Sequence, residues 1–138
     1  MAASPDCDEI GQVSTANASA HYRTRIHETR LMLGDKRCLV ANFNGAISTA
    51  RTIASVKWRT FFGYVAVMSN ARVQANRRSA AVDITANWIG DASIRCEATM
   101  DNGEVYIAPF RISVSGDPIY LPVQTMIGPL ELTATASA

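Results

Sequence analysis

The chain has 138 residues, of which 48% are hydrophobic and 18% charged, and its formal net charge at pH 7 is +1. A single domain of this length removes roughly two thirds of the surface of its unfolded chain from water. The near-neutral charge gives no electrostatic reason to expect a nucleic-acid partner or an acidic membrane surface. No apolar run reaches the ~20 residues of a membrane-spanning helix, and the acidic first residues lack the basic and apolar regions of a secretory signal. We therefore expect no membrane partner and synthesis in the cytoplasm.

The chain begins with a polar segment. Residues 1–20 are rich in Ala, Ser, Thr, Asn and Asp and have no periodic apolar face. By itself, such a segment buries too little apolar surface to offset the entropy that it loses on ordering. It predicts either a frayed terminus or a flexible arm that becomes ordered on a neighbouring molecule.

Alternating apolar and polar residues then predict a series of short strands. A polar edge strand is expected over residues 21–33, with Gly34-Asp35 as the turn after it. Further strands are expected over residues 37–43, 53–59, 64–68 and 71–75. Ser69-Asn70 is expected to turn the chain between the last two.

The clearest pattern lies between residues 79 and 114. Strands are expected over residues 80–86, 92–98 and 105–114, and in each of them alternate residues are apolar. The inward-facing residues would be Val82, Ile84, Ala86, Ile94, Cys96, Ala98, Tyr106, Ala108, Phe110, Ile112 and Val114. Asp101-Asn102-Gly103 predicts a hairpin turn, because Asn and Gly tolerate the positive φ that tight turns need.

The C-terminal part of the sequence is apolar but interrupted. Ser115-Gly116-Asp117-Pro118 is a strong stop signal, and prolines in the stretch that follows exclude a helix or a central strand over residues 119–130. This stretch is therefore expected to be extended. Residues 131–138 are able to add one short strand.

About seven or eight short strands separated by turn signals predict an all-β antiparallel sandwich. The sandwich domain is assigned to residues 21–116. It is flanked by a flexible N-terminal arm, residues 1–20, and by an extended C-terminal arm, residues 117–138.

Residues 90–104 and the strand at residues 110–114 resemble the final hairpin of an immunoglobulin-like domain. Such domains pair two cysteines of facing sheets beside a buried tryptophan, and Cys38, Trp58 and Cys96 follow in that order. The resemblance implies an immunoglobulin-like sandwich and raises the hypothesis of a Cys38–Cys96 disulfide. The alternative is that both are buried structural thiols. Ile94 stands where such a domain would carry the tyrosine of a tyrosine corner.

The Ala/Thr/Asn/Arg-rich composition, the sandwich and the extended termini together resemble accessory virion proteins of tailed bacteriophages. Those proteins decorate the capsid or adapt tail and fibre components to one another. The resemblance implies a non-enzymatic structural protein of the virion, made in the host cytoplasm, that binds other virion proteins and associates with itself as a homo-oligomer.

No residues are assigned as catalytic, cofactor-binding or metal-binding. His21 and His27 lie six residues apart, too far for one metal ion to be held by them alone, and no zinc-type Cys or His spacing occurs. The carboxylates Asp6, Asp8 and Glu9, and separately Asp101 and Glu104, lie on a terminus and at a hairpin tip, where a general acid–base pair lacks a cleft. They are interpreted as solvated charges.

Eleven arginines accompany only two lysines, which is a composition found at protein interfaces. A group of them, Arg72, Arg77, Arg78, Arg95 and Arg111, predicts either a basic patch or a solvated face paired with neighbouring carboxylates. We favour the solvated face.

The predicted partner interface is the apolar part of the C-terminal arm. It comprises Ile119, Tyr120, Leu121, Val123, Met126, Ile127 and Leu130. The arm lies either along its own sandwich or in a neighbouring subunit, where it pairs with a sheet edge. The alternative function is a carbohydrate- or ligand-binding module that uses Phe61, Phe62 and Tyr64.

Overall fold

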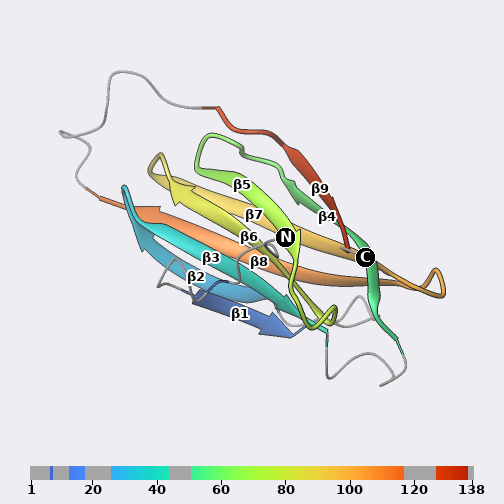
Figure 1. Ribbon diagram of the computed structural model, residues 1–138. Helices are drawn as coiled ribbons and strands as arrows, with labels where there is room; N and C mark the ends of the chain where they lie inside the picture. The colour runs from blue at the N-terminus through green and yellow to red at the C-terminus, as the bar shows by residue number, and fades with distance from the viewer. Residues whose placement is uncertain (1–6, 8–12, 18–25, 44–50, 117–126, 137–138) are drawn as a thin grey trace.

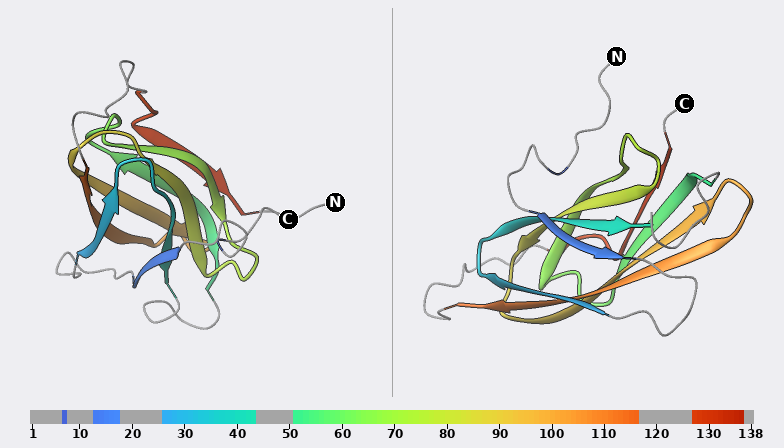
Figure 2. Two further views of the ribbon diagram at one scale, coloured as in Figure 1. Left: turned by 90° about the vertical axis from the view of Figure 1, so that its left-hand side faces the viewer. Right: turned by 90° about the horizontal axis from the view of Figure 1, so that it is seen from below.

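The computed structural model describes residues 7, 13–17, 26–43, 51–116 and 127–136. These residues form strands joined by turns and loops, in two layers that lie face to face (Figure 1 and Figure 2). The strands are β1 (Val13–Asn17), β2 (His27–Met32), β3 (Lys36–Asn42), β4 (Ile53–Thr60), β5 (Ala66–Val73), β6 (Ser79–Ala86), β7 (Gly90–Met100), β8 (Val105–Ser115) and β9 (Glu131–Thr135). The predicted all-β sandwich is confirmed.

One layer is a four-stranded sheet in the order β1-β3-β6-β5, and the other is a five-stranded sheet in the order β2-β8-β7-β4-β9. Most neighbouring strands are antiparallel, as expected, but β1 runs parallel to β3 and β2 runs parallel to β8. The reason for the first pair is topological. β2 lies in the opposite sheet, so the polypeptide passes through that sheet before it returns as β3, which runs in the same direction as β1. Parallel neighbours need such a crossover connection.

Strand alternation builds the interior between the sheets. The inward residues predicted on β6, β7 and β8 are all buried. Trp58 of β4, the largest fully buried side chain of the described residues, pairs in register with Cys96, which in turn pairs with Ala108. These two small neighbours leave room for the indole, whose ring centroid lies 5.7 Å from that of Phe110. From the facing sheet the cluster includes Leu39, Ala41, Met68, Ala80, Val82 and Ile84.

Two predicted turns are confirmed by their backbone. Gly34 (φ 93°) turns the chain between β2 and β3, and Gly103 (φ 90°) turns it between β7 and β8. In the second turn the amide of Gly103 donates to the carbonyl of Met100 at 3.0 Å. The side-chain oxygen of Asn102 accepts from the amide of Glu104 at 3.1 Å.

The turn expected at Ser69-Asn70 is wrong, because β5 continues through it. Asn70 adopts a φ of 53°, and the pairing of β5 with β6 shifts register between Ser69 and Arg72. The residues that tolerate a turn here form a β-bulge instead. Two hydrogen bonds stabilise this bulge. The side-chain amide of Asn70 donates to the carboxylate of Asp83 at 3.3 Å, and the main-chain carbonyl of Asn70 accepts from the guanidinium of Arg72 at 2.7 Å.

Segments near both termini contribute strands to the sandwich. Within the segment expected to be a flexible N-terminal arm, residues 13–17 form β1 beside β3. Within the segment expected to be an extended C-terminal arm, residues 131–135 form β9, which pairs with β4 and lies beside β5. β9 is therefore the edge of the five-stranded sheet where the two sheets approach each other.

Candidate functional site

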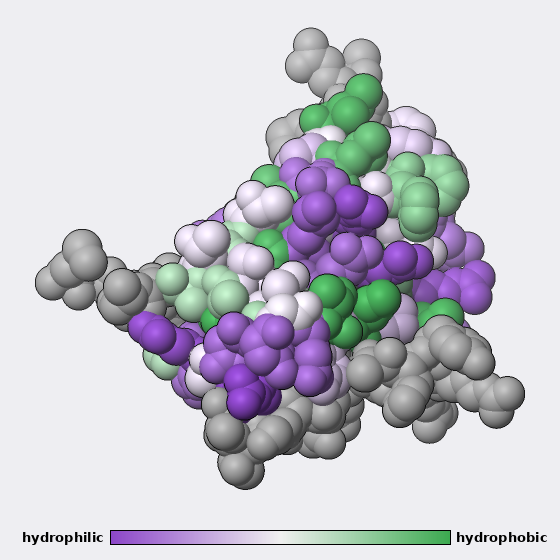
Figure 3. Space-filling view, turned by 90° about the vertical axis from the view of Figure 1, so that its right-hand side faces the viewer, coloured by the Kyte–Doolittle hydropathy of each residue, from purple (hydrophilic) through white to green (hydrophobic). Residues whose placement is uncertain are grey.

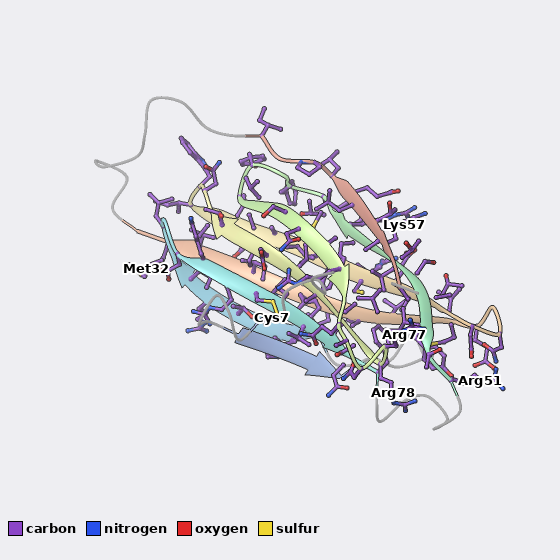
Figure 4. The ribbon with its side chains drawn as sticks, viewed as in Figure 1. Cys7, Met32, Arg51, Lys57, Arg77 and Arg78 are labelled. Carbon is purple, nitrogen blue, oxygen red and sulfur yellow. A yellow bond between two sulfur atoms is a disulfide. The ribbon has the colours of Figure 1, made fainter. Side chains whose placement is uncertain are left out.

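The outer face of the four-stranded sheet carries a disulfide between Cys7 and Cys38 (Figure 4). The hypothesis of a Cys38–Cys96 disulfide is therefore wrong, and the alternative of two buried thiols holds for Cys96 but not for Cys38. Leu39 of β3 faces the interior, so its neighbour Cys38 faces outward, where it packs with Cys7, Val40 and Ala81. Cys96 instead points into the interior as a buried free thiol. Burial, and after it the charge of Glu97, raise the pKa of this thiol well above its ordinary value.

Arg72 is buried beside this disulfide, with only 3% of its surface exposed. Its guanidinium lies 3.0 Å from a carboxylate oxygen of Asp83, and it also contacts the sulfur of Cys38 at 3.4 Å. The carboxylate and the bulge carbonyl of Asn70 offset the cost of removing the positive charge from water. Arg72 is thus a structural residue of the outer face.

The five arginines considered as a basic patch do not form one surface. Arg72 is buried on the outer side of the four-stranded sheet, whereas Arg95 and Arg111 are exposed on β7 and β8 of the other sheet. Arg77 and Arg78 lie at the β5–β6 turn, near Arg51 at one end of the sandwich (Figure 4). That end faces the viewer in Figure 3, where hydrophilic surface is interrupted by small hydrophobic areas.

The other titratable candidates also lie apart. The described ranges contain no group of three or more His, Cys, Asp or Glu side chains that could hold a metal ion. His27 packs edge-on against Phe110 at 5.8 Å, and His21 and the N-terminal carboxylates lie outside the described residues. Glu104 accepts a hydrogen bond from Tyr106 at 2.9 Å and raises the pKa of that phenol.

A cluster of exposed apolar side chains, which we call the apolar patch, lies where β4 ends. It comprises Phe61 (71% exposed), Phe62, Tyr64, Ile127 (81% exposed) and Leu130. The rings of Phe62 and Tyr64 pack edge to face at 6.1 Å. Contiguous exposed apolar surface of this kind marks interaction sites in soluble proteins.

Two glycines bring the halves of the apolar patch together. The amide of Gly128 donates to the carbonyl of Gly63 at 2.9 Å, and the amide of Thr60 donates to the carbonyl of Leu130 at 2.9 Å. The contact is so close that a Cβ on Gly63 would lie 2.8 Å from the carbonyl oxygen of Gly128. After these contacts the C-terminal segment continues as β9, which pairs with β4. Glu131 of β9 forms an ion pair with Arg59 of β4 at 3.1 Å.

A groove of about 350 Å³ adjoins the apolar patch on the outer face of the five-stranded sheet. We call it the outer groove. Its apolar walls include Ile26, Phe61 and Phe62, and its polar lining comes from Asp91, Ser93, Arg95 and Arg111 of β7 and β8. The sheet thus places aromatic rings and charged groups around one hollow.

Most of the predicted C-terminal interface lies outside the described residues. Ile119, Tyr120, Leu121, Val123 and Met126 lie outside the described residues. Ile127 and Leu130 are described and exposed, as an interface requires. Of the two arrangements left open for the arm, residues 127–136 follow the first, because they lie along their own sandwich.

The sequence placed Phe61, Phe62 and Tyr64 in one candidate site and Ile127 and Leu130 in another, 60 or more residues apart. The structure joins them in one patch. Gly63 and Gly128, each beside apolar residues, were the available signal, because a glycine admits close backbone approach.

A scan against protein-family models and a search of curated proteins both match nothing. Among solved structures, the chain is similar to the cysteine protease inhibitor EhICP2 from Entamoeba histolytica, at 8% identity and a TM-score of 0.45, over 75% of this chain and 96% of that chain. It is also similar to amebosin, at 9% identity and a TM-score of 0.35, over 75% of this chain and 98% of that chain. Likeness at this level carries no functional argument. Within the described ranges, no helix is long and apolar enough to span a membrane.

The disulfide can be tested by thiol counting. In the native protein we expect no cysteine to react with a thiol reagent, because Cys96 is fully buried. One thiol should react after denaturation without reductant, and three after reduction. The Cys96→Ala variant, as control, should show none before reduction. Three reactive thiols in the denatured, unreduced wild type would contradict the Cys7–Cys38 bond.

The ion pair of Arg72 gives a second prediction. Asp83→Asn removes the carboxylate that lies 3.0 Å from the buried guanidinium, so we expect the free energy of unfolding to fall by about 2–4 kcal/mol in urea titrations. Asp101→Asn is the matched control. It removes an ion pair with Arg51 whose two side chains are 38% and 41% exposed, so it should cost no more than about 1 kcal/mol. Equal effects of the two substitutions would show that burial of Arg72 does not matter.

The attachment of the C-terminal segment gives a third prediction. Gly63→Ala places a methyl group against the carbonyl of Gly128, so the segment must shift. We expect a loss of about 1–3 kcal/mol in unfolding free energy and faster hydrogen exchange at the amides of Thr60 and Gly128. Thr133→Val, an exposed change on β9 that keeps a β-branched side chain, is the control. Unchanged exchange in Gly63→Ala would mean that the segment does not depend on this contact.

Proposed function

We propose that the protein is a non-enzymatic structural component of a phage virion, a capsid decoration protein or a tail or fibre adaptor. It attaches to neighbouring subunits through the apolar patch. The observation that carries this proposal is the gathering of Phe61, Phe62, Tyr64, Ile127 and Leu130 at one place on the sandwich.

The physical reason is the cost of leaving these side chains in water. Burying one large apolar side chain stabilises a contact by about 1.5–3 kcal/mol, and aromatic residues are enriched at the centres of protein interfaces. The patch rests on strand ends and on a backbone contact between two glycines. Little ordering entropy is therefore lost when a partner covers it.

The assignment to a virion rests on the resemblance of the whole sequence to phage accessory proteins. An arginine-rich, lysine-poor composition supports a role at protein interfaces. Stable contacts of this kind bury over ~2,000 Å² in total, which is more than one patch of five side chains. We therefore propose that further surface of the protein takes part, including contacts between its own copies.

A truncation of the C-terminal arm does not test this function cleanly. Removal of residues 117–138 also removes β9, which pairs with β4, so a failure to assemble would have two explanations. Substitutions of exposed side chains within the apolar patch leave the sheet intact.

The double variant Phe61→Ser/Phe62→Ser is expected to weaken attachment at least about tenfold. The measurement is the fraction of the protein that co-sediments with particles made from the structural genes that neighbour its coding sequence. Val105→Ser, which alters an exposed apolar residue outside the patch, is the control and should attach like the wild type. Wild-type protein that does not sediment with the particles would contradict the proposed function.

The second candidate function is a carbohydrate-binding module. It is favoured by one observation, the outer groove, in which aromatic rings adjoin charged and hydroxyl groups. A glycan array probed with the wild type and with Phe62→Ala, which alters a ring that lines the outer groove, separates the two functions. A glycan that the wild type retains and Phe62→Ala loses would support the module and count against the virion role.

A further inference from the structure

We propose that the outer groove binds an extended protein segment of the neighbouring subunit that presents a carboxylate between apolar side chains. This inference rests on the proposed function and names the chemistry of its partner. It follows from the charge and the walls of the groove rather than from its size alone.

The groove lies across the outward faces of β7 and β8. Ser93 of β7 and Arg111 of β8 pair in register, so their side chains share this face of the sheet. Ile26 stands on the side of β2, and Phe61 and Phe62 stand at the end of β4. A segment that crosses the sheet between these walls would cover apolar surface at both ends and the Arg111 side chain between them.

Arg111 is the charge that this arrangement leaves available. Within the described part of the protein, its guanidinium makes no ion pair or hydrogen bond, although Glu28 is its register partner on β2. The other charged side chains of the groove have hydrogen-bond or ion-pair neighbours, although Asp91 keeps its negative charge because its neighbour is a neutral hydroxyl. Arg95 lies 3.5 Å from a carboxylate oxygen of Glu97, and Asp91 accepts a hydrogen bond from Ser113 at 2.7 Å.

A carboxylate is the group that complements Arg111. The planar guanidinium offers parallel N–H donors that match two carboxylate oxygens. Apolar walls around such a pair keep water away and so strengthen it. An aspartate, a glutamate or the terminal carboxylate of a polypeptide supplies the same group.

The surroundings of the groove favour a protein over a sugar as its occupant. The apolar surface continues from Phe61 and Phe62 to the aliphatic side chains of Ile127 and Leu130, and Ile26 forms the opposite wall. Aliphatic surface suits the apolar side chains of a peptide better than the hydroxyl groups of a sugar. Extended segments that insert alternate side chains into pockets are a common mode of recognition.

The test uses an array of synthetic ten-residue peptides with the central pattern apolar-X-apolar, where X is Glu, Gln or Lys and the apolar positions are Phe, Leu, Ile or Tyr. The full-length protein is expected to retain Glu members about tenfold more strongly than the matched Gln members, and this preference should weaken with added salt. Acidic glycans on the same array report the competing occupant.

Arg111→Gln should abolish the preference for Glu over Gln. Arg30→Gln is the matched control, because Arg30 is exposed on the same sheet, on β2, but does not line the groove. It should keep the preference. Glu28→Gln should increase retention of the Glu members, since it removes a negative charge beside Arg111.

Equal retention of Glu and Gln members by the wild type would overturn the inference, and so would an unchanged preference in Arg111→Gln. Retention of acidic glycans alone, dependent on Arg111, would also overturn it, because the occupant would be a sugar. These failures differ from failure of the proposed function. If Arg111→Gln still attaches to particles and Phe61→Ser/Phe62→Ser does not, the structural role stands and only the carboxylate is excluded.

Discussion

The burial of the two inner sheet faces against each other is the constraint on which every other feature depends. The large Trp58 side chain fits into this interior because its cross-strand neighbour Cys96, and Ala108 beyond it, are small. A larger residue at either position would compete with the indole for the same space. With this interior in place, the outward side chains of the same strands are held in fixed rows. Outward side chains of β7 and β8 line the outer groove, and the outward side chain of Cys38 on β3 forms the disulfide.

The two outer faces of the sandwich have different characters. On the four-stranded sheet, the Cys7–Cys38 disulfide packs beside a buried arginine that is paired with Asp83. Around the disulfide, this face is covered by side chains of the protein itself. On the five-stranded sheet, Arg111 is exposed beside aromatic rings. The second face therefore combines apolar surface with an arginine that has no ion-pair partner among the described residues.

Close backbone contact is what brings separate segments together in one apolar patch. Gly63 and Gly128 meet through a hydrogen bond of 2.9 Å, and the apolar residues on either side of each glycine then share one exposed area. The C-terminal segment has two roles as a result. Its β9 completes a sheet edge, and Ile127 and Leu130 extend the patch begun by Phe61 and Phe62.

Local pattern alone determined most strands of this protein, but not β1, whose residues 13–17 carry no apolar periodicity and pair with β3. Period-two alternation places Val82, Cys96 and Phe110 inside with no knowledge of their partners, because a strand's side chains alternate whatever it pairs with. Asn102 and Gly103 likewise encode their turn through their own backbone preferences. At Ser69-Asn70 the same preferences gave a wrong prediction. A bulge and a turn both use residues that tolerate a positive φ, and only the pairing of β5 with β6 distinguishes the two.

Only the tertiary structure decided which distant residues meet. The disulfide partner of Cys38 depends on the face that β3 turns toward the interior and on where residue 7 lies, neither of which spacing specifies. The apolar patch depends on the return of the polypeptide to β4 after residue 126. Contacts between segments 60 residues apart are set by the packing of the whole sandwich, and no local preference of Phe61 or Leu130 encodes them.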